Sequence, residues 1–95
     1  MRLKVSERAR ADLLEIYLTS ARTFGERQAE TYYLGLMELF AHLTAFPLSS
    51  NVRSEYRGSI RVVRHQSHQI AYRVRRNEVL IVRVLHGARD LKRHL

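Results

Sequence analysis

The 95-residue sequence contains no cysteine, a single proline and only four glycines. Without cysteine the chain has neither a disulfide framework nor a thiolate metal site, which fits a reducing cytoplasm. No apolar run approaches the roughly 18 residues of a membrane-spanning helix, and the amino terminus lacks the shape of a signal peptide. The scattered glycines form no phosphate-binding loop. We therefore expect one cytoplasmic domain over residues 1–95, with no membrane association.

Acidic residues are also scarce, with 9 Asp and Glu against 17 Lys and Arg, so that the net charge is +8. A small basic domain usually meets an acidic partner, which can be a nucleic acid, an acidic protein or an anionic membrane surface. Composition does not choose among these. The basic residues are spread over the predicted strands and the tail rather than along one helix, so direct nucleic-acid binding is only weakly indicated.

Residues 59–86 are the most regular part of the sequence. Three runs rich in Val, Ile and Tyr are separated by two short polar breaks, Gln66-Ser67 and Arg76-Asn77. β-branched and aromatic residues favour strands, and two-residue breaks are typical of antiparallel hairpins. The pattern predicts a three-stranded meander with strands at residues 59–65, 68–75 and 78–86. The last run is the most apolar, and we expect it to be the central strand of the sheet.

The first half of the chain predicts a short strand and two helices. Residues 2–5 alternate between apolar and basic and should pair with the later sheet. Ser6 is a candidate N-cap for a helix over residues 7–22, and Gly25 suits the turn into a second helix over residues 26–45. Pro47 ends that helix, and residues 48–57 form one long polar loop. The order β-α-α-β-β-β predicts an α+β fold in which a helical hairpin packs on a small, mainly antiparallel sheet.

The second predicted helix has a wide apolar face, whose stripe includes Tyr33, Leu36 and Phe40. This face either contacts both the first helix and the sheet, or stays partly exposed until a partner covers it. An exposed face would make the free protein dimeric or prone to aggregate.

Side chains alternate along a strand, so each of the first two meander strands has one apolar and one basic face. On the third strand, strict alternation separates Leu80, Val82 and Val84 from Val79, Ile81, Arg83 and Leu85. Arg83 interrupts an otherwise apolar run. It either pairs with an acid or belongs to a surface that binds an anion or a partner.

Three histidines invite a chemical interpretation. His65 and His68 flank a turn and should face each other, while His86 ends the next strand. No Asp, Glu or Cys is spaced to complete a metal site, so we expect no metal and no cofactor. A ribonuclease would instead use His86 for proton transfer and Arg83 with Arg61 to stabilise phosphorane charge. No second acid–base group is evident on that face, because Tyr72 is expected in the core.

The tail, residues 87–95, is basic and carries Leu91 and Leu95 at helical spacing. It is either a frayed terminus or a helical turn that docks through these leucines.

Several segments together resemble the ParE family of toxins from type II toxin–antitoxin systems, within the RelE/ParE superfamily. The matching residues are Gly25, Ala29 and Tyr32; His68, Ile70 and Tyr72; and Val84, Leu85, His86, Arg89 and Asp90. The match covers essentially the whole chain. It implies the same β-α-α-β-β-β fold and a cytoplasmic antitoxin with a ribbon-helix-helix DNA-binding part, through which DNA would be bound. An acidic, partly disordered antitoxin tail would wrap the toxin.

The resemblance also implies a non-enzymatic toxin that inhibits DNA gyrase. RelE-like relatives with this fold instead cut messenger RNA on the ribosome, and fold alone does not separate the two activities. The chain has no C-terminal tyrosine and no lysine in residues 59–86, which favours gyrase over the ribosome. A third hypothesis is a module that has lost its toxicity. We expect target contacts at Arg83, His86, Arg89 and Arg93, and antitoxin contacts at Tyr33, Leu36, Phe40, Arg61 and Arg73.

Overall fold

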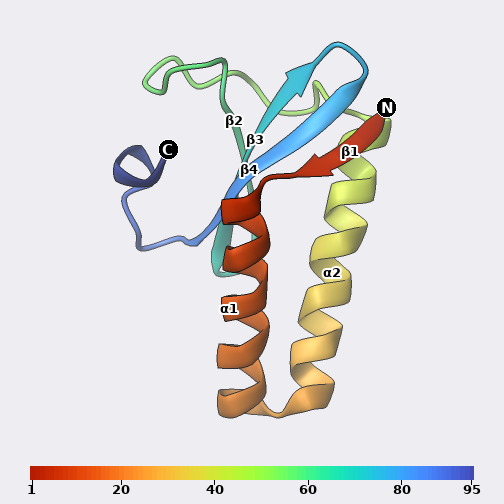
Figure 1. Ribbon diagram of the computed structural model, residues 1–95, viewed down its shortest axis with the longest axis vertical. Helices are drawn as coiled ribbons and strands as arrows, with labels where there is room; N and C mark the ends of the chain where they lie inside the picture. Colours follow the sequence, from red (N-terminus) through yellow and green to blue (C-terminus); the bar gives the residue numbers. More distant parts are fainter.

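A computed structural model describes all 95 residues. Its elements are β1 (Arg2–Val5), α1 (Glu7–Phe24), α2 (Glu26–Ala45), β2 (Arg61–His65), β3 (His68–Arg75), β4 (Glu78–His86) and the 3-10 helix η1 (Leu91–His94). The two helices stand side by side as a hairpin that extends past one end of the sheet (Figure 1). Neither helix combines the length and the apolar character that crossing a bilayer requires. The predicted β-α-α-β-β-β order is confirmed.

The sheet has the strand order β1-β4-β3-β2. β1 runs parallel to β4, while the pairs β2–β3 and β3–β4 are antiparallel. The strand β4 therefore lies inside the sheet, as its apolar sequence predicts. Both hairpins turn through two residues, and the first of each turn, Gln66 or Arg76, has a positive φ of 49° or 45°.

Ser6 makes the connection between β1 and α1. Its Oγ accepts a hydrogen bond from the N–H of Ala9 at 3.0 Å, which confirms the predicted N-cap. The same hydroxyl donates to the carbonyl of Val82 at 2.8 Å. The start of α1 is thereby tied to the edge of β4 where β1 ends. Gly25, with φ of 92°, joins the two helices in the left-handed region that suits glycine.

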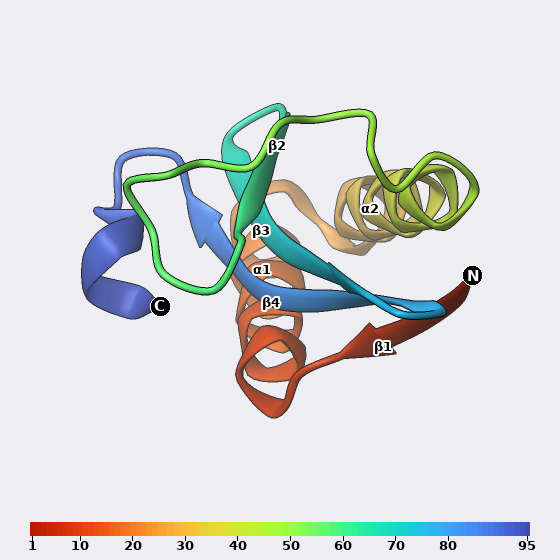
Figure 2. The same cartoon turned by 90° about the horizontal axis from the view of Figure 1, so that it is seen from above.

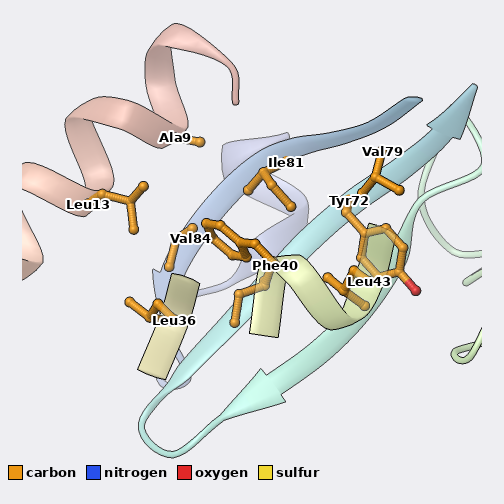
Figure 3. Packing of buried hydrophobic residues seen from close by; sticks show 10 residues of the cluster. Ala9, Leu13, Leu36, Phe40, Leu43, Tyr72, Val79, Ile81 and Val84 are labelled. Carbon is orange, nitrogen blue, oxygen red and sulfur yellow. The ribbon is translucent and has the colours of Figure 1, made fainter. Parts of the chain in front are cut away.

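The main core lies between the helices and the sheet (Figure 3). Its ten buried residues come from α1, α2, β3 and β4: Ala9, Leu13, Leu36, Phe40, Leu43, Ile70, Tyr72, Val79, Ile81 and Val84. Leu36 and Phe40 are fully buried. The interpretation that these two stay exposed for a partner is wrong, because α2 uses them to pack on the sheet. Tyr33, from the same stripe, is 37% exposed.

A β-bulge changes the phase of β4. Ala71 pairs with Arg83 while the next residue, Tyr72, pairs with Ile81, so Val82 is the extra residue. Val84 therefore shares the main core with Val79 and Ile81. The strict alternation predicted for this strand is wrong beyond Val82, since one inserted residue moves every later side chain to the other face.

A second, smaller core covers part of the opposite face of the sheet. It consists of Ile60, Ala71, Leu85 and Leu91, with Tyr56, Val62 and Val82 packed against it. Figure 2 shows the C-terminal segment on the other side of β2 and β3 from α2. Leu91 docks this segment and is 3% exposed, whereas Leu95 stays exposed. The docked turn is thus confirmed for Leu91, and the face that was expected to carry arginines is partly covered.

Candidate functional site

A hollow of about 560 Å³, here called the α1–β4 pocket, gathers most of the candidate site residues. It lies between α1, the start of α2, the β2–β3 turn and the end of β4. Its chemically active lining residues are Asp12, Glu15, Tyr32, His68, Arg83, His86 and Arg89. Three of the four expected target contacts, Arg83, His86 and Arg89, are therefore brought together here. The fourth, Arg93, lies in η1 outside this lining and is 3.8 Å from the carboxylate of Asp90.

Asp12 and Arg83 form a buried ion pair on one wall of the pocket. Arg83 donates from Nε and Nη2 to the two carboxylate oxygens of Asp12, at 2.8 and 2.9 Å. The backbone N–H of Val84 donates to the same carboxylate at 2.9 Å, and Arg83 Nη1 donates to the carbonyl of His94 at 2.8 Å. Hydrogen bonding to Asp12 raises the pKa of Arg83 above its ordinary value. One guanidinium thus joins α1, β4 and the tail.

The sequence left two interpretations of Arg83, and the structure confirms the first, in which Arg83 pairs with an acid, here Asp12. Both side chains are about 10% exposed, and three donors of the guanidinium are engaged. Arg83 is therefore not the free cation that a target contact or a phosphorane-stabilising role requires.

A tyrosine–histidine pair occupies the opposite wall. The hydroxyl of Tyr32 donates to the carbonyl of His65 at 3.1 Å and lies 2.6 Å from His68 Nδ1. Tyr32 has one hydroxyl proton, and both the carbonyl of His65 and Nδ1 of His68 lie within its reach, so the tautomer of His68 decides which group donates in the shorter contact. The ring of His86 lies edge-on to His68, with centroids 5.7 Å apart.

Burial sets the proton affinities of this pair. Loss of solvent lowers the pKa of His68, and the imidazoles of His86 and His65 lower it further. Burial also raises the pKa of the Tyr32 hydroxyl. Both groups are therefore neutral near pH 7, and the Tyr32 hydroxyl orients the ring of His68.

His65 anchors the β2–β3 hairpin on α2. Its Nε2 is buried without a hydrogen-bond partner, and its ring packs on Gly35. A Cβ at position 35 would come within 3.1 Å of that nitrogen. The helical glycine therefore makes room for the imidazole, which in turn fixes Tyr32 and the turn that lines the pocket.

The remaining predicted residues lie elsewhere. Arg61 donates from Nη1 to the carbonyl of Ser50, and Arg73 donates from Nε to the carbonyl of Gly58 at 2.7 Å. Both arginines therefore hold the loop before β2. Arg61 starts β2 opposite Tyr72, whereas His86 pairs with His68 at the other end of the strands. The set Arg61, Arg83 and His86 is not assembled around one point.

Asp12 and Tyr32 were not chosen as site residues from the sequence. Each had a signal: Asp12 lies three residues after Ala9 on the apolar face of α1, and Tyr32 lies four residues before Leu36 on α2. A polar group on a buried face needs a partner, and the partners here come from β2, β3 and β4.

The observed fold is the one that the resemblance to the ParE family implies. The model of the family described as "ParE toxin of type II toxin-antitoxin system, parDE" matches residues 3–91. The chain belongs to this family, which confirms the resemblance. Such a toxin implies an antitoxin partner. A solved structure of the chromosomal ParDE TA system from P. aeruginosa is similar, with 25% identity and a TM-score of 0.78 over 90% of this chain and 95% of that one. No curated protein matches the sequence.

Proposed function

We propose that this chain inhibits DNA gyrase by binding, without catalysing a reaction, and that a ribbon-helix-helix antitoxin neutralises it in the cytoplasm. Membership of the ParE family is the observation that carries this proposal. The geometry gives independent support, because the arginines that a ribonuclease would need are engaged elsewhere. Arg83 is held by Asp12, and Arg61 is held by Ser50.

The exposed rim of the α1–β4 pocket is the proposed target surface. His86 and Arg89 line it and are exposed, and Arg93 adds a nearby exposed cation on η1. Because electrostatic attraction between surfaces acts at a distance, these groups would favour encounter with an acidic region of the target. Arg83 contributes by positioning β4 and the tail rather than by contact.

The antitoxin is proposed to cover the helical hairpin. Tyr33 lines a shallow, mainly apolar hollow with Leu13, Leu14 and Tyr17. The exposed ring of Tyr33 and the exposed side chain of Leu14 are a suitable seat for apolar residues of a partner. Acidic antitoxin residues would then meet the neighbouring Arg10. Light scattering of the free toxin tests whether this face drives self-association, and a monodisperse monomer would contradict that part.

The deciding experiment is a supercoiling assay with purified gyrase, ATP, relaxed plasmid and this protein free of antitoxin. We expect supercoiling to be lost and linear, protein-linked DNA to accumulate. The variant Arg89→Ala should weaken inhibition, while Arg22→Ala, an exposed charge at the far end of α1, should not. Unchanged supercoiling by a protein that still kills cells would contradict the proposal.

A second candidate is a ribosome-dependent mRNA endonuclease. One observation favours it: a neutral imidazole, that of His68, lies in the pocket, oriented by Tyr32 and next to His86. If this candidate is correct, messages are cleaved after induction, and His68→Ala or His86→Ala alone abolishes toxicity while antitoxin binding persists. Intact messages in intoxicated cells would exclude it.

A further inference from the structure

A basic hollow lies at the other end of the sheet from the α1–β4 pocket. Its lining is Arg2, Arg75, Arg76, Asn77 and Glu78, with no apolar residue. Arg2 on β1 and Arg75 on β3 both pair with Glu78 on β4 and so flank it on one face of the sheet. Arg76 adds a third guanidinium from the β3–β4 turn. Strands far apart in sequence therefore bring three arginines to one point.

The charges of this hollow are poorly compensated. Three guanidinium groups face one carboxylate, which leaves a net charge of +2 (3 − 1) from the lining. The closest pairing, Arg75 Nη2 to Glu78 Oε1, is 3.8 Å, longer than a hydrogen bond. The side chains of Arg2 and Arg76 make neither an ion pair nor a hydrogen bond. They differ in this from Arg83, whose donors are engaged within the fold.

The basic strip continues along the same face. Lys4 on β1 and Arg73 on β3 both pair with Leu80 on β4. Side chains two residues apart on a strand share a face and stand about 7 Å apart. Lys4 therefore stands one row behind Arg2, and Arg73, whose Nε donates to the carbonyl of Gly58, stands one row behind Arg75. Repeated cations at such spacing suit a repeating anion.

The backbone at Arg76 is the least favourable place for an arginine. Its φ is 45°, in the left-handed region where two-residue hairpin turns normally have asparagine or glycine. A side chain with a Cβ is disfavoured there. Arginine at this position adds a charge at the tip of the hairpin in a conformation that glycine would adopt more easily.

The absence of apolar groups indicates which partner this surface fits. The centre of a protein interface is more apolar than its rim, and the lining of this hollow has no apolar side chain for such a centre. Phosphate oxygens need only positive donors, and guanidinium matches them with two parallel hydrogen bonds. We propose that Arg2, Arg75 and Arg76 bind the phosphate backbone of duplex DNA. In this proposal the toxin contacts DNA directly, without the antitoxin, and the contact does not depend on whether the toxin inhibits gyrase.

The test is fluorescence anisotropy of a labelled DNA duplex of arbitrary sequence with the purified full-length toxin, without antitoxin or gyrase. Three phosphate contacts give a slope of log affinity against log salt of about −2.7, a loss of about 40-fold between 50 and 200 mM salt. The triple variant with Arg2→Ala, Arg75→Ala and Arg76→Ala should lose that slope. A flat salt dependence of the wild type would overturn the proposal.

A charge-matched control separates a site from general basicity. Arg8, Arg22 and Arg27 lie exposed on the helices, and replacing all three by alanine removes the same charge. This control should keep most of the affinity and of the salt slope. Equal losses in the two triple variants would mean that only net charge matters, and would refute a site.

Single glycine variants separate DNA binding from stability. Arg76→Gly relieves the positive φ, so it should raise the unfolding midpoint while the slope becomes shallower by about 0.9. Gln66→Gly relieves the equivalent φ of 49° at the other hairpin turn. It should raise the midpoint and leave DNA binding unchanged. Unaltered DNA binding by Arg76→Gly would remove Arg76 from the proposal.

Discussion

Replacing Asp12 by alanine tests whether a buried ion pair ties α1 to β4 and the tail. The change removes two hydrogen bonds from Arg83 and one from the N–H of Val84. It leaves a guanidinium that is 10% exposed without its counter-charge. Breaking a buried pair in this way costs about 3–5 kcal/mol, which is a large part of the roughly 5–15 kcal/mol that stabilises a domain. Because each kcal/mol shifts the Tm of a domain of this size by about 4–8 °C, we expect the Tm to fall by at least about 12 °C.

Urea denaturation measures the loss as a free energy of unfolding. The exposed pair between Arg53 and Glu55, with a distance of 2.7 Å, is the matched control. Solvent screens that pair, so Glu55→Ala should leave the denaturation midpoint unchanged. Asp12→Ala combined with Arg83→Met should cost less than the sum of the two single changes, because the second removes the stranded charge. If Asp12→Ala is as harmless as Glu55→Ala, the reasoning about this pair is refuted.

Three further predictions concern the supports of the site. Folding lowers the pKa of His68 below its ordinary 6.5. The contribution of His68 to stability is therefore complete above about pH 6.5 and is lost as the pH falls below that value. His68→Gln should flatten this part of the stability–pH profile measured in urea. Gly35→Ala should destabilise the protein through contact with His65, yet stabilise it by about 1 kcal/mol when His65 is also alanine, as a double-mutant cycle would show. Tyr72→Phe removes a hydroxyl that lies 2.6 Å from Ser50 Oγ, and should lower the free energy of unfolding by about 1 kcal/mol in thermal or urea unfolding followed by circular dichroism.

The elements of the fold are local in origin and could be predicted from the sequence. Two-residue turns fix both ends of β3 and the start of β4, and the predicted ranges 68–75 and 78–86 agree with the structure. The cap at Ser6 and the turn at Gly25 mark the helix boundaries in the same local way. The interior position of β4 in the sheet follows from its nearly continuous run of apolar residues, because a strand that is buried on both faces has no face exposed to solvent.

The features that the sequence did not reveal depend on pairing between distant residues. The extra residue at Val82 exists only relative to β3, so alternation along β4 alone places Val84 on the wrong face. Arg83 finds its carboxylate 71 positions earlier in the chain. Phe40 belongs to a wide apolar stripe that could equally have bound a partner, and only the packing of α2 on the sheet shows that it is buried.

Net charge gives no information about which cations are free. Arg83 forms an ion pair with Asp12 inside the protein, and Arg73 donates a hydrogen bond to the carbonyl of Gly58. Arg2 and Arg76 have no such partner, although the sequence presents them no differently. Free and engaged arginines contribute equally to the net charge of +8, but only the free ones are available to an anionic partner. The affinity for such a partner should therefore depend on which arginines are substituted rather than on how many. The paired triple variants test that dependence directly, since they carry the same net charge and differ only in where it was removed.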